Sequence, residues 1–197
     1  MAPVSRGAAP PIVLASTSPQ RRVILEQLGI PFEVVAPAYE ERDAPGADPV
    51  ALVREHARGK ARSAGHGRVV LGVDTAVVLD GRIYGKPRDE EDAAGMLREL
   101  AGKAHDVVSG LCLRAPGWET LEHETTRVVF RSLAGREVAA YVETGEWASR
   151  AGGYAIQGKG ASLVERIDGD YLNVVGLPAA LLVKLLAERL PGRYGFG

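Results

Sequence analysis

The order of short apolar runs and helix-periodic segments constrains the fold of this chain more than any other feature of its sequence. These strand-like runs lie at residues 12–15, 32–35, 69–71, 76–79, 82–84, 106–114 and 119–130, with one more near the end of the glycine-rich segment 154–167. Helical segments are expected at 19–28, 49–63, 89–100, 134–144 and 178–190. Strands that alternate with helices, together with a hairpin across residues 115–117, predict an α/β fold with a mixed sheet.

Local signals support several of these boundaries. Ser18 suits the N-cap of the first helix, Pro19 suits its first position and Gly29 is expected to end it. Asp48 is expected to cap the second helix after a loop over 37–49. The pair Asp80-Gly81 predicts a type I′ hairpin turn between two strands.

The bulk properties indicate one domain with two lobes around a cleft. A length of 197 residues allows a sizeable core, and the expected division is a flexible lead-in at 1–11, a single domain at 12–190 and a tail at 191–197. The 24 basic and 25 acidic residues leave a net charge of -1, which gives no electrostatic footprint for nucleic acid. The one cysteine, Cys112, is expected in the core of a protein from a reducing compartment. No run approaches the roughly 20 apolar residues of a membrane span and the start lacks a secretory signal, so a cytoplasmic location without membrane partners is expected.

The first strand, turn and helix could form an anion site. Backbone N–H groups and the positive end of the helix dipole would converge after residue 15, where Ser16 and Ser18 add hydroxyl groups. Arg21 and Arg22 lie in the first helical turn, where positive charge is unfavourable unless an anion is bound. An ordinary capped helix with two solvated arginines is the alternative.

Asp74 is the strongest single candidate for chemistry. Apolar runs flank it on both sides, and burial of a carboxylate is costly without a partner or a metal. Lys60 lies in a basic helical segment, where a solvated face would explain it equally well. Lys86 follows Gly85 just after the strand that succeeds Asp74, and Glu40-Glu41 sits where paired acids usually form surface charge.

Together these residue types supply what hydrolysis of a phosphoanhydride needs. Lysine and arginine neutralise non-bridging phosphate oxygens, and carboxylates hold a hard cation such as Mg²⁺ or orient the attacking water. The sequence contains no His-x-x-x-His, Cys-x-x-Cys or Walker-type glycine loop, which disfavours zinc and P-loop chemistry.

A series of short motifs, in this order along the chain, resembles the Maf family of nucleotide pyrophosphatases over about residues 12–190. The matching segments are 14–22, 40–41, 59–61, 72–75, 85–87, 152–158, 168–171 and 175–178. The resemblance implies an elongated, Maf/ITPase-like mixed sheet with flanking helices and a central cleft. It also implies an enzyme, often a homodimer, that hydrolyses the bond between the α and β phosphates of a nucleoside triphosphate substrate.

The same resemblance implies roles for individual residues. Asp74 would be the proton acceptor, and Glu41 and Asp74 would bind a divalent metal cation, Mg²⁺ or Mn²⁺. The phosphates would be held by Ser16, Arg21, Lys60 and Lys86.

Three further positions concern the base. Thr75 and Gln157 resemble the branch of the family that prefers dTTP and UTP over modified purines such as 7-methyl-GTP. Gln20 departs from the arginine that many members of that branch carry, so looser discrimination between bases is expected.

Two other functions compete with hydrolysis. A regulatory protein of cell division that binds a nucleotide or a partner is implied by the family's link to inhibition of septum formation. A sugar-nucleotide transferase would need an acceptor site, for which the sequence gives no signal.

Overall fold

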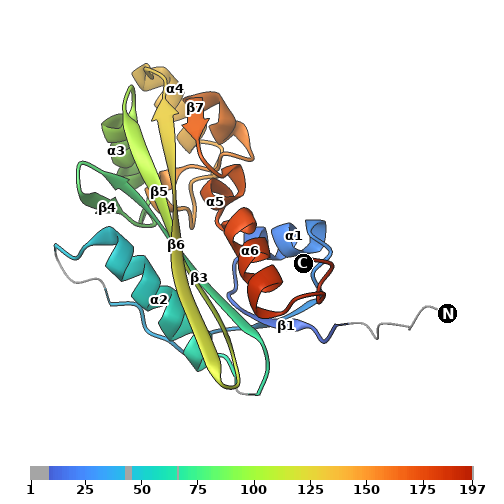
Figure 1. Ribbon diagram of the computed structural model, residues 1–197. Coiled ribbons are helices and arrows are strands. Elements are labelled where there is room, and N and C mark those ends of the chain that lie inside the picture. Colours follow the sequence, from blue (N-terminus) through green and yellow to red (C-terminus); the bar gives the residue numbers. More distant parts are fainter. Residues whose placement is uncertain (1–8, 43–45, 66, 197) are drawn as a thin grey trace.

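A computed structural model describes residues 9–42, 46–65 and 67–196, in which a seven-stranded mixed sheet is flanked by helices (Figure 1). Most of the expected lead-in, the middle of the 37–49 loop and the last residue of the tail lie outside the described residues. The strands are β1 Ile12–Ala15, β2 Phe32–Val35, β3 Val70–Leu79, β4 Arg82–Tyr84, β5 Ala104–Ala115, β6 Trp118–Phe130 and β7 Val164–Asp168. The α-helices are α1 Pro19–Gln27, α2 Pro49–Ser63, α3 Glu90–Leu100, α4 Gly135–Val142, α5 Tyr171–Val175 and α6 Ala179–Arg189, and two 3₁₀ turns are η1 Ala151–Gly153 and η2 Lys159–Leu163.

The sheet has the order β2-β1-β3-β5-β6-β7, and β4 pairs with β3 outside this path. β1 is parallel to both β2 and β3, whereas every other described pair is antiparallel. The expected α/β fold with a mixed sheet is therefore confirmed, as is the long β5–β6 hairpin.

Strand β3 corrects one expectation. Two strands were predicted at residues 69–71 and 76–79 with an interruption between them, but β3 runs without a break through Asp74, which pairs with Gly110 of β5. Gly72 is not a strand breaker here. A Cβ atom at Gly72 would lie 2.2 Å from the carbonyl oxygen of Ala57, so this glycine is where helix α2 packs against the strand.

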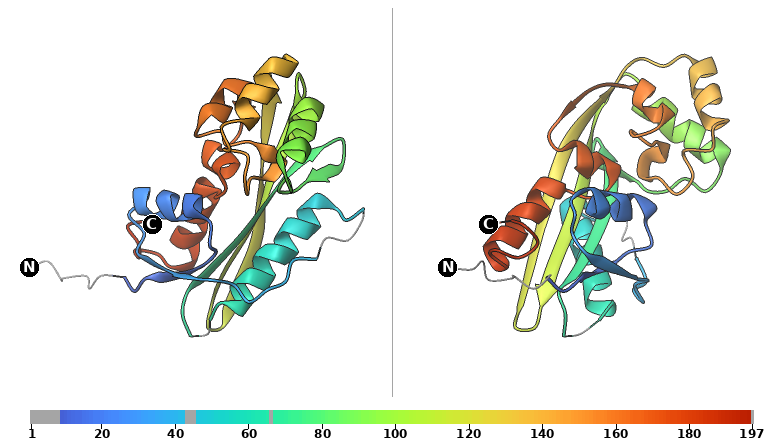
Figure 2. Two further views of the ribbon diagram at one scale, coloured as in Figure 1. Left: turned by 180° about the vertical axis from the view of Figure 1, so that it is seen from behind. Right: turned by 90° about the vertical axis from the view of Figure 1, so that its right-hand side faces the viewer.

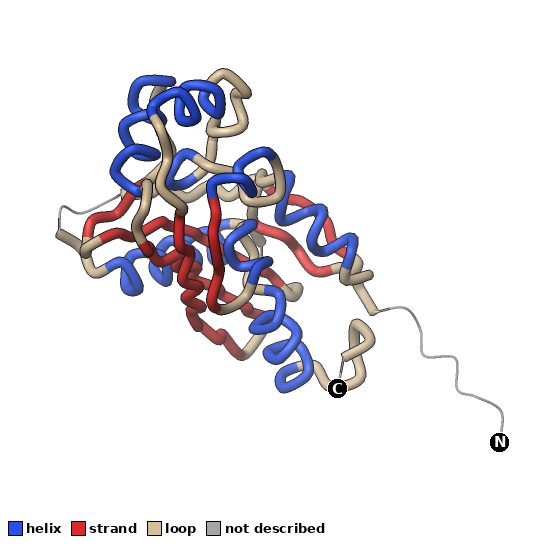
Figure 3. Tube along the Cα trace, turned by 90° about the horizontal axis from the view of Figure 1, so that it is seen from above, coloured by secondary structure: helices blue, strands red, loops and turns tan. Residues whose placement is uncertain are grey.

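The helices cover the two faces of the sheet, as Figures 2 and 3 show. Because side chains alternate along a strand, Val13 and Val70 pack with α2 on one face, whereas Leu14 and Leu71 pack with α1 and α6 on the other. The termini of the described chain lie together near α1 and α6, where the Tyr194 hydroxyl donates to the carbonyl oxygen of Pro10 at 2.9 Å.

On the α1 and α6 face, the apolar core divides into two clusters along β3 and β5. One contains Val73 and Leu111 with α1 and α6, and the other contains Val77 and Val107 with α3 and α4. Thr75 lies on this face between the two clusters. The expected arrangement of two lobes around a central cleft is confirmed, and the division falls beside Asp74.

Most of the local signals behave as expected. Gly29 has a φ of +66°, the Asp48 side chain accepts from the backbone N–H of Ala51, and Asp80 and Gly81 both have positive φ values of 52° and 79°. Ser18 is the N-cap of α1, but its hydroxyl donates to Oε1 of Gln20 rather than capping the helix. Helix α5 was not predicted, since its five residues are too short to show a period.

Over the described residues, the structure has no helix that is long and apolar enough to cross a membrane.

The packing of α2 on β3 predicts that Gly72→Val is strongly destabilising. The added side chain would force the helix backbone away from the strand, and we expect a loss of about 1–3 kcal/mol or more in the free energy of unfolding. Gly95→Ala is the matched control, because a Cβ at this helical position meets nothing within 4 Å and should be neutral or stabilise by up to about 1 kcal/mol. Equal denaturant midpoints for the two variants would contradict this account of the packing.

Candidate active site

The candidate site lies at an interruption in the pairing of β3. Along one edge of this strand, β1 pairs as far as Gly72 and β4 begins to pair at Val77. Residues 73–76, which we call the β3 gap, therefore have only β5 as a partner strand within the described sheet. Because neighbouring residues point to opposite faces, the gap presents Asp74 toward α2 and Thr75 toward α1. A cleft of about 560 Å³ opens at this position.

Lys60 links two carboxylates in the cleft. Its Nζ atom lies 2.6 Å from Oδ1 of Asp74 and 2.6 Å from Oε1 of Glu41. The Lys60 side chain is only 9% exposed and that of Asp74 14%, whereas that of Glu41 is 45% exposed. The expected alternative for Lys60, a solvated basic face of α2, is therefore wrong.

His56 completes the surroundings of Asp74, although it was not among the predicted site residues. It is buried one helical turn before Lys60 on α2, and its Nδ1 atom lies 3.3 Å from Oδ2 of Asp74. Residues four apart share a helix face, so the spacing of His56 and Lys60 is the signal that could have identified it. The Tyr39 ring packs edge-on against His56 and also lies over Gly59, which brings the segment containing Glu41 onto the helix.

Asp74 is ionised under all ordinary conditions. Burial by itself would raise the pKa of Asp74, but the hydrogen bond with His56 and the charge of Lys60 outweigh it and lower the pKa to about 2. The ionised carboxylate can only accept hydrogen bonds, so the Nδ1–H of His56 is the donor in this contact.

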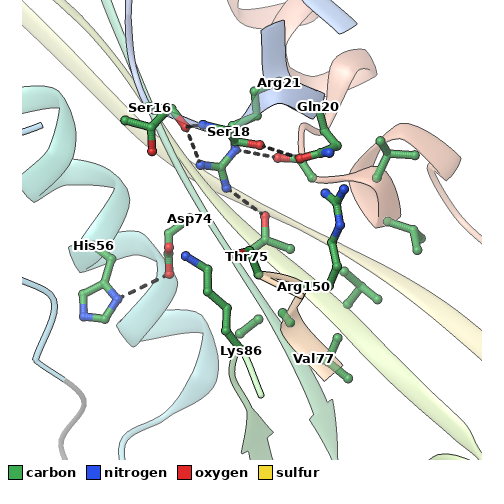
Figure 4. A pocket seen from close by; sticks show the side chains of 18 of the residues that line it. Ser16, Ser18, Gln20, Arg21, His56, Asp74, Thr75, Val77, Lys86 and Arg150 are labelled. Carbon is green, nitrogen blue, oxygen red and sulfur yellow. Dashed lines mark hydrogen bonds and ion pairs between the residues drawn. The ribbon is translucent and has the colours of Figure 1, made fainter. Parts of the chain in front are cut away.

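Arg21 forms the opposite wall of the cleft. Its guanidinium donates to Oγ of Ser16 at 3.0 Å, to Oγ1 of Thr75 at 3.3 Å and to the carbonyl oxygen of Gly176 at 2.8 Å (Figure 4). Burial lowers the pKa of Arg21, although the charges of Asp74 and Glu41 oppose this shift. Arg22 is exposed. Of the two arginines that were expected to be solvated in the alternative interpretation, Arg22 is solvated and Arg21 is not.

The remaining predicted residues also line the cleft. Lys86 extends from the segment after β4 toward Asp74, as Figure 4 shows. Gln20, Thr75 and Gln157 are also part of the lining, so the structure brings every sequence-predicted site residue to one cavity. Ser109, whose hydroxyl lies 2.9 Å from that of Thr75, and Arg150 are two neighbours that the sequence did not indicate.

A group of three side chains in the cleft could hold a metal ion. One ligand atom each from Glu41, His56 and Asp74 lies within 4.8 Å of the others. Two carboxylates suit hard cations such as Mg²⁺ and Mn²⁺. Since the His56 Nδ1–H is engaged with Asp74, we assign His56 to orienting that carboxylate rather than to the ligand set.

The network predicts that Lys60→Met raises the pKa of Asp74 above about 2, because the variant removes the ammonium from both carboxylates and leaves them to repel each other. A carboxyl ¹³C NMR titration of Asp74 measures this directly. The exposed Lys184→Met, on α6, is the control. A value that stays at about 2 in Lys60→Met would exclude Lys60 as a cause of the shift.

The free energy of unfolding should depend on pH through the same carboxylate. The pKa of Asp74 lies below its ordinary value of 3.8 when folded, so its contribution is present above about pH 4 and is lost as the pH falls toward about 2. In Lys60→Met this contribution should be smaller, and acid unfolding curves should begin to fall at a higher pH.

Comparison with known proteins agrees with this geometry. Residues 11–189 match the family model described as Maf-like protein. The chain is 50% identical over 188 residues to a dTTP/UTP pyrophosphatase of Nitratidesulfovibrio vulgaris, covering 92% of this chain and 89% of that protein. It is 46% identical over 180 residues to a dTTP/UTP pyrophosphatase of Aquifex aeolicus, covering 90% and 94% respectively.

Among solved structures, that of the Staphylococcus aureus Ham1 protein aligns with a TM-score of 0.47 and 14% identity, covering 61% of this chain and 72% of that one. The family match spans nearly the whole described chain, and every motif named above except 168–171 contributes a residue to the cleft at the β3 gap. The chain belongs to the Maf-like protein family.

Proposed function

We propose that this protein hydrolyses nucleoside triphosphates between the α and β phosphates and releases a nucleoside monophosphate and pyrophosphate. The observation that carries this proposal is the ionised Asp74 at the β3 gap, facing a cleft whose other walls supply Arg21, Lys60 and Lys86. A carboxylate beside several cationic donors can activate water next to a polyanion. The relatives named dTTP/UTP pyrophosphatase support the same reaction.

Asp74 is the proton acceptor in this proposal. In the free protein its pKa of about 2 makes it a weak base, because Lys60 and His56 stabilise the charged form. A triphosphate competes for the Lys60 ammonium. As Lys60 turns to the phosphate, one of the causes that lower the pKa of Asp74 is removed, so substrate binding itself strengthens the base.

The phosphate chain lies along the cationic wall. Ser16 and Arg21 stand at the start of α1, where free backbone N–H groups and the helix dipole favour an anion. Lys60 and Lys86 approach from α2 and from the segment after β4. Charged hydrogen bonds of this kind contribute about 1.5–3 kcal/mol each.

Glu41 and Asp74 would hold the divalent cation, Mg²⁺ or Mn²⁺. The donor set fits such an ion, since both groups offer carboxylate oxygens and their ligand atoms lie within 4.8 Å of each other. The ion would supply charge neutralisation for the triphosphate and polarisation of its oxygens. The carboxylates of Glu41 and Asp74 would supply the negative charges that hold the ion.

Base selection is assigned to Thr75, Gln157 and Gln20. The amide of Gln157 can give one donor and one acceptor to the edge of uracil or thymine, where a carbonyl lies beside the N3 donor. Gln20 is itself engaged by the Ser18 hydroxyl at 3.1 Å and carries no fixed charge. We therefore propose dTTP and UTP as the preferred substrates, with some turnover of other nucleotides.

A cell-division role, a homodimer and a cytoplasmic location stay predictions from the sequence. A protein that only binds nucleotides would not need an ionised carboxylate beside the groups that hold the phosphates, which favours hydrolysis over pure regulation.

The proposed function is tested with a panel of dTTP, UTP, CTP, GTP and 7-methyl-GTP, measured as kcat/KM for pyrophosphate release. We expect dTTP and UTP to be the best substrates, with monophosphate and pyrophosphate in equal amounts. A clear preference for 7-methyl-GTP would overturn the base assignment. Release of orthophosphate in place of pyrophosphate would overturn the reaction.

The same assay tests the cation. Excess EDTA should abolish turnover and added Mg²⁺ or Mn²⁺ should restore it, because two carboxylates and a triphosphate cannot share one cleft favourably without a counterion. Undiminished turnover in EDTA would remove the metal from this account.

A further inference from the structure

Arg150 is a charged residue of the cleft to which the proposed function gives no role. It lies between α4 and η1, on the lobe opposite α1, and lines the same cavity as Asp74 and Thr75. Figure 4 shows its side chain extending into the cleft toward Gln20.

The backbone around Arg150 is held in a defined conformation. Ser149 adopts a φ of +62°, which is rare for a residue with a side chain, and Gly152 follows with a φ of +68°. The N–H of Gly152 donates to the carbonyl oxygen of Gly85 at 3.0 Å, and a Cβ at Gly152 would lie 2.9 Å from Cγ2 of Val77. The segment is thus fastened to β3 and to the residue before Lys86, which fixes where Arg150 emerges.

The guanidinium has no partner in the part of the chain that the structure describes. Its Nε atom is buried without a hydrogen bond, and none of the ion pairs among the described residues includes it. Burial lowers the pKa of Arg150, and the opposite effect of Tyr141 and Glu146 is smaller. The Glu146 carboxylate is occupied elsewhere, since it accepts from the backbone N–H groups of Lys159 and Gly160.

The other arginine of the cleft behaves differently. Arg21 has three acceptors within the protein, and Lys60 has two carboxylates. A buried N–H donor of a cation, such as the Nε of Arg150, destabilises the protein when it has no acceptor. A ligand that supplies the acceptor removes this free-energy cost. An anion does so better than a neutral carbonyl, because a charge-assisted contact to phosphate can be bidentate.

We propose that Arg150 is a substrate ligand that donates hydrogen bonds to phosphate oxygens of the bound nucleotide. This inference rests on the proposed function and adds a binding residue from the second lobe to those on α1, α2 and the segment after β4. The triphosphate would then bridge the two lobes, contacted by Arg21 on one side and Arg150 on the other.

The test compares Arg150→Gln, Arg150→Lys and the exposed control Arg136→Gln on the neighbouring helix α4. We expect Arg150→Gln to raise KM for dTTP about ten- to hundredfold, which corresponds to one lost charged hydrogen bond. The inhibition constant of pyrophosphate, as a competitive inhibitor, should rise by a similar factor, whereas the inhibition constant of thymidine should not change. Arg150→Lys should recover part of the loss, and Arg136→Gln should match the parent.

The outcomes separate this inference from the proposed function. A parent protein that releases no pyrophosphate from any nucleotide contradicts the function, and calorimetric titration with inorganic pyrophosphate then tests Arg150 without turnover. If Arg150→Gln has the thermal stability of the parent but unchanged KM and pyrophosphate affinity, the inference is wrong. If thymidine inhibition weakens and pyrophosphate inhibition does not, Arg150 contacts the base and the phosphate assignment is overturned.

Discussion

The ion pair between Lys60 and Asp74 is the interaction on which the site depends. A carboxylate in the middle of a continuous strand, between two apolar clusters on the α2 face of the sheet, is stable only if cations or hydrogen-bond donors approach it closely. The closest of these cations comes from α2, so the helix must lie near the strand. Gly72 and Gly110 permit that approach, since a Cβ at either position would lie 2.2 Å from a backbone oxygen of α2.

The magnitudes show that the hydrogen bond from His56 and the charge of Lys60 together outweigh burial. A fall in the pKa of Asp74 from 3.8 to about 2 corresponds to about 2 kcal/mol in favour of the charged form, after the penalty for desolvation has been met. The ionised state is therefore a property of the folded protein before any ligand binds. The same contacts that stabilise the charge also make Asp74 a weak base in the free protein.

Much of the fold could be predicted because its signals are local. Pro19 and Gly29 delimit α1, Asp48 begins α2, and Asp80-Gly81 forms the expected turn. The β3 gap could not be predicted, because it depends on where β1 stops pairing and β4 begins, which is a matter of register between distant segments. For the same reason the sequence did not indicate that Gly72 marks a contact between strand β3 and a helix.

The residues of the candidate site likewise fall into those that could be predicted from the sequence and those that could not. Asp74 was identified because a charge within apolar runs is conspicuous, and the other residues followed from ordered motifs. His56 and Arg150 were missed, since a histidine among basic helical residues and an arginine in a loop resemble surface residues in sequence. Only the folded chain shows that one donates to Asp74 and that the other enters the cleft without a partner.

In the proposed function, the charge of Asp74 serves the reaction rather than the binding of the nucleotide. Asp74→Asn keeps the size of the side chain and removes the charge, so dTTP binding and turnover can be measured on the same variant. In the presence of metal we predict that turnover falls by at least about a hundredfold, within the usual range for loss of an acid–base group, while the Kd for dTTP changes little. Turnover within about twofold of the parent would contradict the account.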